Sequence, residues 1–402
     1  MNRVYLDHIS SCPLDLEVLQ AMLPFLKENF GNPGALHQEG LYAREAISHA
    51  RKQVANLINA KSDSEIIFTS SGTEANNLAL KGAALALKNH GNHIIVSAIE
   101  HPSVLNSAEF LESLGFEITK IPVNKFGLID PEDIRKAITP KTILVATHLV
   151  NHDIGAIQPI KEISNITTEC GISLFVDATA CVGWLNIDVQ KLAIDYLSIS
   201  FHRFYGPKGV GALYKNRHAR LRSLIHGGFQ EFGLRAGVEN VPAIVGAGKA
   251  AELASAKLNM RQEHTRKLQA YLWKELKTNI PYIQLNGPEI GSQRITTNLN
   301  VSPEFIEGEG QLLRLDLMGF AVASGSSCVT KNLKSSPVLK AMGVDPGLAQ
   351  GSIIVTIGEE NTLEQMASFV QAYTKTVAQL RSMSPLWDDF QKGKIKSAIA
   401  QN

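Results

Sequence analysis

The chain has 402 residues, of which 44% are hydrophobic and 19% charged, and its formal net charge is +1 at pH 7. This length allows two domains, and the composition is ordinary for a globular protein. A net charge so close to zero argues against nucleic acid or an anionic membrane surface as a partner. No run approaches the ~20 apolar residues of a membrane span and the first residues lack an apolar signal core, so we expect a cytoplasmic protein.

The first half of the chain alternates between helix and strand patterns. Helical periodicity predicts helices from about 15 to 30 and from about 39 to 58. A strand is expected over 65–70, and a helix running to about residue 88 opens at Ser71-Gly72-Thr73-Glu74. Further β-prone runs, with helical stretches between most of them, lie at 94–97, 117–121, 142–147, 173–177 and 196–200. This alternation predicts an α/β fold whose mostly parallel sheet is covered by helices on both faces.

The second half begins with a long helix and then changes character. A charged amphipathic helix is predicted from about 243 to 279, and mixed strands and helices follow Pro281 up to a last helix over about 363–383. We place the domain boundary near residue 258. The expected division is a large domain over 15–257, a small C-terminal domain over 258–402, and an N-terminal arm over 1–14 that joins the small domain.

A loop after the run at 196–200 carries the strongest local signal for a ligand. Ser200 and His202 follow that strand, Arg203 adds a positive charge, and Gly206 forces a tight turn. Ligands of open α/β sheets bind past the carboxyl ends of strands, so this segment reads as an anion-binding loop or, alternatively, as a surface turn. The start of the helix at Thr73 offers backbone N–H groups and a hydroxyl, which also suit a phosphate.

The loop Ser200-Phe201-His202-Arg203-Phe204-Tyr205-Gly206-Pro207-Lys208-Gly209 resembles the cofactor-lysine loop of cysteine desulfurases, which are fold-type-I enzymes that use pyridoxal phosphate (PLP). The resemblance spans nearly the whole chain. Its further matches are Phe30-Gly31-Asn32-Pro33, Ser70-Ser71-Gly72-Thr73-Glu74-Ala75-Asn76-Asn77, Glu100-His101, Val176-Asp177-Ala178-Thr179 and Ser324-Gly325-Ser326-Ser327-Cys328. It implies a large domain with a mostly parallel seven-stranded sheet, a smaller C-terminal α+β domain, and a homodimer with its site in the cleft between the domains.

The resemblance also implies roles for single residues around the cofactor. Thr73, Ser200 and His202 match the residues that bind the cofactor phosphate. Asp177 matches the carboxylate that pairs with the ring nitrogen, and His101 matches the imidazole that stacks on the ring and moves protons. Purely structural roles are the alternatives: Asp177 could cap a turn, and His101 could be a buried histidine whose hydrogen bonds are all made within the fold.

Cys328 matches the nucleophile that takes the substrate sulfur and carries it as a persulfide. It lies in a polar Ser-Gly-Ser-Ser-Cys-Val-Thr segment, which is typical of an exposed loop. The stretch Ser384-Pro385-Leu386-Trp387-Asp388-Asp389-Phe390 resembles the family segment that docks an iron–sulfur scaffold protein. If exposed, Leu386, Trp387 and Phe390 would suit such a contact, although Trp387 could equally pack against its own domain.

Five positions depart from the family pattern. Arg203 stands in place of the Schiff-base lysine, and a guanidinium is neither an amine nucleophile nor a proton shuttle. In the family a glutamine and an asparagine touch the cofactor, and this chain has Ala180 and His152 at those positions. Val238 replaces a threonine that reaches the phosphate across the dimer, and Ile354 replaces an arginine that binds the substrate carboxylate.

These departures predict that ordinary desulfurase chemistry on free cysteine is absent or very weak. We do not expect Lys208 to replace the missing lysine, because the family has that residue in addition to the catalytic one. In the expected arrangement Arg203 fills the lysine's place and pairs with Asp177. Covalent PLP is therefore expected to be absent.

Three functions remain open from the sequence. The first is a lysine-lacking homologue in iron–sulfur cluster assembly, which docks a scaffold and offers Cys328 as a persulfide carrier or as a ligand of a shared cluster. The second is an enzyme that holds PLP without a covalent bond, with His101 or His152 handling protons. The third is a non-catalytic partner of an active paralogue.

Overall fold

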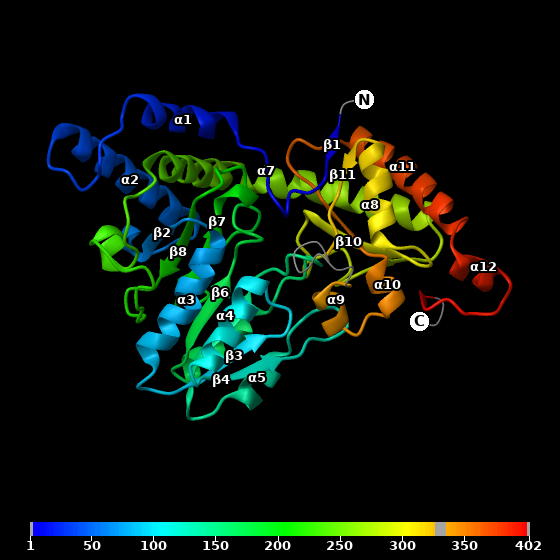
Figure 1. Ribbon diagram of the computed structural model, residues 1–402, viewed down its shortest axis with the longest axis horizontal. Coiled ribbons are helices and arrows are strands. Elements are labelled where there is room, and N and C mark those ends of the chain that lie inside the picture. The colour runs from blue at the N-terminus through cyan, green and yellow to red at the C-terminus, as the bar shows by residue number, and fades with distance from the viewer. Residues whose placement is uncertain (1–2, 326–334, 400–402) are drawn as a thin grey trace.

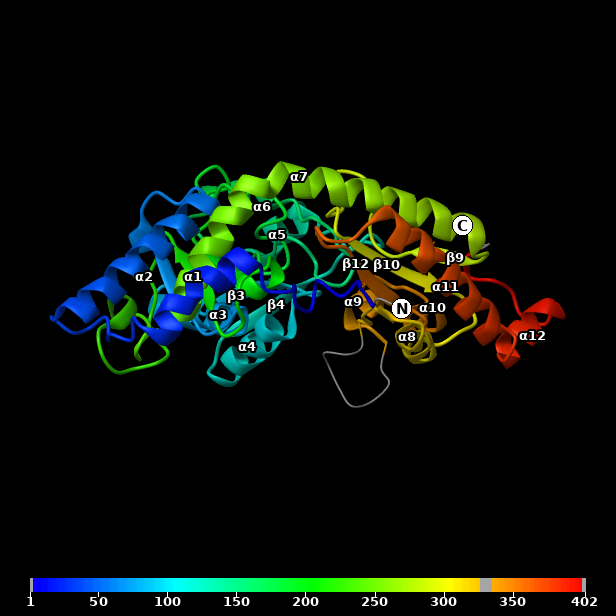
Figure 2. The ribbon, with the colours of Figure 1, turned by 90° about the horizontal axis from the view of Figure 1, so that it is seen from above.

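The computed structural model describes residues 3–325 and 335–399. Figure 1 shows two parts, with the first two-thirds of the chain on one side and the remainder on the other. A single long helix, α7 (Val241–Asn279), runs along both, as Figure 2 shows from above.

The larger part is built around a seven-stranded sheet in the order β2-β8-β7-β6-β5-β3-β4. All of its strands run parallel except β8, which is antiparallel to both neighbours. The strands are β2 (Ile66–Thr69), β3 (His93–Ser97), β4 (Glu117–Ile121), β5 (Thr142–His148), β6 (Ser173–Asp177), β7 (Tyr196–Ser200) and β8 (Gly211–Lys215).

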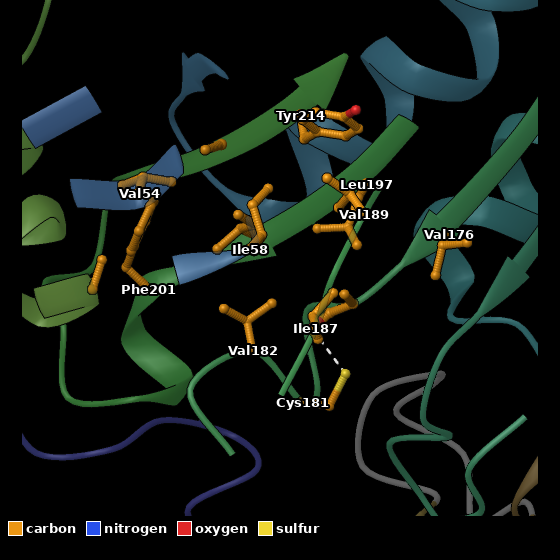
Figure 3. Packing of buried hydrophobic residues seen from close by; sticks show 14 of the residues in the cluster. Val54, Ile58, Val176, Cys181, Val182, Ile187, Val189, Leu197, Phe201 and Tyr214 are labelled. Carbon is orange, nitrogen blue, oxygen red and sulfur yellow. Dashed lines mark hydrogen bonds between the residues drawn. The ribbon is translucent and has the colours of Figure 1, made fainter. Parts of the chain in front are cut away.

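Helices cover both faces of this sheet. They are α1 (Leu16–Lys27), α2 (Gln38–Leu57), α3 (Gly72–Leu87), α4 (Pro102–Ser113), α5 (Pro131–Ala137) and α6 (Ile160–Glu169), together with the short 3-10 helices η1 (Asp63–Glu65), η2 (Phe201–Arg203) and η3 (Gln230–Gly233). Successive residues of β5 belong to different hydrophobic cores, with Val145 on one face of the sheet and Leu144 on the other. Successive strand side chains point to opposite faces, so two cores form. Figure 3 shows part of the first core, with Phe201 of η2 in it.

The smaller part contains a three-stranded antiparallel sheet in the order β12-β10-β9. Its elements after α7 are β9 (Ile283–Leu285), β10 (Asn298–Pro303), α8 (Gly308–Leu317), β11 (Phe320–Ala321), α9 (Pro337–Ala341), α10 (Pro346–Gln350), β12 (Ile353–Thr356), α11 (Leu363–Arg381) and α12 (Pro385–Gln391). The N-terminal strand β1 (Val4–Tyr5) pairs in parallel with β11. The α/β class and the seven-stranded sheet expected from the sequence are confirmed.

The two ends of helix α7 pack into different hydrophobic cores. Its buried residues up to Ala254 belong to the core of the large sheet, and those from Leu268 onward belong to the core of the smaller part. This change brackets the expected boundary near residue 258, although the boundary itself stays a prediction. Within the described ranges, no helix is long and apolar enough to cross a membrane.

Candidate functional site

A cavity of about 150 Å³ lies at the edge of the sheet where the parallel strands end. Parallel strands bring their carboxyl ends to one edge, so the loops that follow β2, β3, β6 and β7 meet there. The residues that line the cavity are Ser71, Gly72, Thr73, Asn76, His101, Ser103, Thr179, Ser200, His202 and Arg203. Four lie at the start of α3, two at the start of α4, one after β6 and three at the end of β7.

The loop after β7 turns sharply and places Arg203 in the cavity wall. Ser200 ends the strand, and the backbone N–H groups of Phe204 and Gly206 both donate to the carbonyl of Phe201. A side chain at Gly206 would meet the Phe201 carbonyl oxygen at 2.8 Å, so the turn needs glycine there. The main-chain oxygen of Arg203 is held by Trp184, whose indole Nε1–H donates to it at 2.9 Å.

The start of α3 supplies donors on the opposite wall. Ser71 is the N-cap of the helix, and its hydroxyl accepts from the Glu74 N–H at 3.1 Å. Thr73 is exposed in the first turn, where backbone N–H groups lack intrahelical partners. A Cβ on Gly72 would meet Thr179 Cγ2 at 2.7 Å, so glycine permits the close approach of α3 to the loop after β6.

Asp177 ends β6 directly behind the cavity and is buried. Its carboxylate accepts hydrogen bonds from Asn76 Nδ2 at 2.8 Å, the Thr179 N–H at 2.9 Å and Ser198 Oγ at 3.2 Å. Burial raises the pKa of Asp177, but its hydrogen bonds with Thr179, the nearby His101 and the bond from Asn76 outweigh burial and hold the pKa below the usual range. The group is therefore an anion at neutral pH.

Two histidines meet over the cavity. His101 is the N-cap of α4, and its ring lies edge-to-face with that of His152, with ring centres 5.2 Å apart. Burial lowers the pKa of His101, and the charge of Arg203 lowers it further against the opposing effect of Asp177. Burial lowers the pKa of His152 well below its usual value, and the nearby His101 and Arg203 lower it further, because each disfavours a second positive charge beside it. Both rings are therefore neutral at neutral pH.

His202 is the third histidine of the site. Its Nδ1 lies 3.2 Å from Ser200 Oγ. Burial, followed by the charges of Arg203 and Lys208, lowers its pKa to about 4. A neutral imidazole at this position can donate one hydrogen bond and accept one.

The structure thus brings together the described residues to which the resemblance assigns a role around the cofactor. Thr73, His101, Ser200, His202 and Arg203 line the cavity, and Asp177 and His152 contact lining residues. Cys328 lies outside the described residues. Within the described ranges, no group of three or more His, Cys, Asp or Glu side chains could hold a metal ion.

Sequence reasoning assigned no role to three residues that complete the site. Asn76, Ser103 and Thr179 all line the cavity, and Asn76 donates to both Asp177 and Ser103. Asn76 lies one helical turn after Thr73, and Ser103 follows His101 by two positions. The spacing of Asn76 is a signal that could have revealed it, because residues one turn apart share a helix face. The signal for Ser103 is its place two residues after an N-cap, where the cap side chain accepts a backbone hydrogen bond.

The other departures from the family pattern lie around or away from the cavity. Ala180 lines a second, very small hollow together with Arg203. Ile354 is buried in β12, and Val238 is 62% exposed in the segment after η3. At the C-terminal end Leu386 is 56% exposed, whereas Trp387 packs against Tyr282 and Phe305 of its own domain. The packing alternative is therefore the observed one for Trp387.

Comparison with known proteins agrees with this fold and site. The aminotransferase class-V family model matches residues 4–369. The cysteine desulfurase IscS of Dictyoglomus turgidum is 46% identical over 97% of this chain and 98% of its own, and that of Clostridium botulinum strain Hall is 44% identical over 98% and 99%. A solved NifS-like protein superposes with a TM-score of 0.88 at 34% identity, covering 94% of this chain and all of its own. This chain therefore belongs to the aminotransferase class-V family, among its IscS- and NifS-like cysteine desulfurases.

PLP is the cofactor of this family, and the site fits it only in part. The donors of Thr73, Ser200 and His202 suit a phosphate, and ionised Asp177 suits a protonated ring nitrogen. Within the described chain, the residues that line the cavity include no lysine, and Arg203 has no amine to offer. A cavity of about 150 Å³ is also below the roughly 300–1,000 Å³ usual for ligand pockets. The residues fit the phosphate and ring ends of the group and do not fit its covalent attachment.

Proposed function

We propose that this chain is a cysteine desulfurase homologue that serves iron–sulfur cluster assembly without covalent PLP chemistry. The observation that carries the proposal is Arg203, which lines one cavity with Thr73, His101 and Ser200. A guanidinium stays protonated in proteins, so it cannot form the covalent anchor that an amine forms. The family fold, with its other donors, would then serve to hold and present sulfur rather than to extract it from free cysteine.

Cys328 is the sulfur-handling group in this proposal. As a thiolate it would accept a sulfane sulfur atom from a persulfide donor, whose own thiolate leaves, and carry it as a persulfide; alternatively it would ligate a cluster together with cysteines of a scaffold protein. The C-terminal segment supports docking at one position, because Leu386 is exposed while Trp387 and Phe390 pack with Tyr282 and Phe305. Leu386 would therefore make the apolar contact, and the aromatic group behind it would hold α12 in place.

A homodimer is part of the proposal. Phe30, Leu36 and Phe229 are 84%, 85% and 95% exposed, which is unusual for large apolar side chains. Phe229 lines a hollow of about 570 Å³ together with Gly34, so the segment after α1 and the segment before η3 lie side by side. A second copy of this chain would cover these side chains.

Cys328→Ser tests the sulfur-handling role in the complex with the scaffold protein. We expect the variant to lose the retained persulfide sulfur or cluster, measured as cyanide-reactive sulfane sulfur, acid-labile sulfide and iron after anaerobic gel filtration. The matched control is Cys170→Ser, which removes an exposed cysteine elsewhere. Equal retention in Cys328→Ser and the control would contradict the role.

A second function is favoured by one observation, namely that the donors for a phosphate and the ionised Asp177 are retained. The protein would then be an enzyme that binds PLP without a covalent bond. Alanine released from cysteine by the wild-type protein would support this function over the proposed one. Its absence, with an active relative as the positive control, would support the proposed one.

A further inference from the structure

His101 is linked to Asp177 by a chain of side-chain hydrogen bonds. Asn76 Nδ2 donates to Asp177 Oδ2 at 2.8 Å and to Ser103 Oγ at 2.8 Å. Ser103 Oγ in turn lies 2.7 Å from Nδ1 of His101. Asp177, Asn76 and Ser103 therefore form a connected path between a buried carboxylate and the imidazole of the cavity wall.

The direction of the two bonds from Asn76 follows from the charge of Asp177. A carboxylate only accepts, and Asp177 is ionised, so the amide of Asn76 must turn its NH₂ group toward it. That NH₂ group has two hydrogens, and the second one reaches Ser103 Oγ. Because Ser103 accepts from Asn76, its own hydroxyl hydrogen is available for His101.

A second donor meets the same nitrogen of His101. The backbone N–H of Ser103 donates to Nδ1 at 3.1 Å, as the N-cap of α4. Nδ1 therefore accepts and carries no hydrogen. In a neutral imidazole the hydrogen must then lie on Nε2.

We infer that Asn76 and Ser103 are positioning residues that fix His101 in its Nε2–H tautomer, and that His101 therefore serves the cavity as a hydrogen-bond donor. In this state Nε2 cannot take a proton from a bound molecule, and Nδ1 is engaged by Ser103. The ligand edge that meets His101 must accept, as the oxygen of an anionic group does. Only this last step, the choice of ligand, rests on the proposed function.

The inference is tested on the tautomer itself, without cofactor or substrate. The protein is labelled with ¹⁵N-histidine, the signals of His101 are assigned by their loss in His101→Gln, and ring ¹H–¹⁵N correlations are followed against pH. We expect the Nε2–H pattern in the wild-type protein at neutral pH. A proton on Nδ1 would overturn the inference.

Ser103→Ala removes one of the two donors that oppose a proton at Nδ1. We expect the titration midpoint of His101 to rise by about half a pH unit or more, because the neutral ring loses a hydrogen bond to Nδ1 that stabilises it. The groups that face His101 from other elements, Asp177, Arg203 and His152, are unchanged in this variant.

Two further variants separate the relay from a general effect on α4. Ser107→Ala removes a hydroxyl one turn further along the helix that bonds Asn77 and the Ser103 carbonyl, not His101. Ser103→Thr keeps the hydroxyl and should keep the wild-type titration. A shift in Ser103→Ala no larger than that in Ser107→Ala would overturn the role of Ser103. These NMR measurements use no PLP, so their failure would leave the proposed function standing. Failure of the proposed function would likewise leave the tautomer of His101 standing.

Discussion

At the scale of residues, one positive charge organises the electrostatics of the site. Arg203 lowers the pKa of His101, His152 and His202 in addition to the effect of burial. The guanidinium keeps its charge, and burial together with this charge keeps the three imidazoles neutral at neutral pH.

His202 gives a direct measure of this effect. Its pKa is lowered to about 4 by burial first and by Arg203 second. Removing the charge in Arg203→Gln should raise the midpoint of His202 only in part, since burial remains. Lys208→Gln is the control, because Lys208 contributes less than Arg203. Ring NMR against pH measures both, and a larger rise in Lys208→Gln would contradict this account.

The same shift sets a pH dependence of stability. An unfolded histidine titrates near ~6.5, whereas folded His202 titrates at about 4. Between these values the unfolded chain binds a proton that the folded chain does not. The contribution of His202 to the free energy of unfolding is therefore present above the higher value and is lost as the pH falls through this window.

At the scale of elements, a buried ion pair anchors the segment around η3. Arg51 of α2 donates to both carboxylate oxygens of Glu231, at 2.6 and 2.7 Å. Glu231 also accepts from the backbone N–H of Phe68 in β2 at 2.8 Å. Its own backbone is left-handed, with φ 48°, so side-chain bonds hold it in a conformation that costs free energy.

Glu231→Gln should therefore be strongly destabilising, because it leaves the Arg51 charge buried without its partner. We expect a loss of about 3–5 kcal/mol in the free energy of unfolding, measured by urea denaturation at pH 7. Glu263→Gln, in the exposed pair with Lys267, should leave the urea midpoint unchanged. Equal midpoints for the two variants would show that the buried pair does not anchor this segment.

At the scale of the whole molecule, periodicity and chain order allowed much of the fold to be predicted. The strand runs, the long helix α7 and the α/β alternation depend on local patterns, which sequence carries directly. The antiparallel direction of β8 was not predicted, because the turn at Gly206 shows that the chain reverses but not which strand it pairs with. The packing of α7 into two different cores likewise depends on tertiary structure, which a local pattern does not give.

The sequence predicted which residues form the site, but it did not predict the hydrogen bonds between them. Asp177 was expected at the site, but the hydrogen bonds that it accepts from Asn76, Thr179 and Ser198 were not predicted. Those partners lie on three different elements, and a linear pattern does not give the distances between them. The docking role of Trp387 was left open for the same reason, since its ring contacts depend on how α12 folds back.

The measurement that tests the central claim most directly is covalent trapping of the cofactor. The protein is incubated with PLP, reduced with borohydride, digested, and its lysines are mapped by mass spectrometry. We predict no stoichiometric pyridoxyl modification in the wild-type protein, and modification at position 203 in Arg203→Lys. A wild-type protein modified stoichiometrically at one lysine, such as Lys208, would contradict the claim that this site has lost its covalent chemistry.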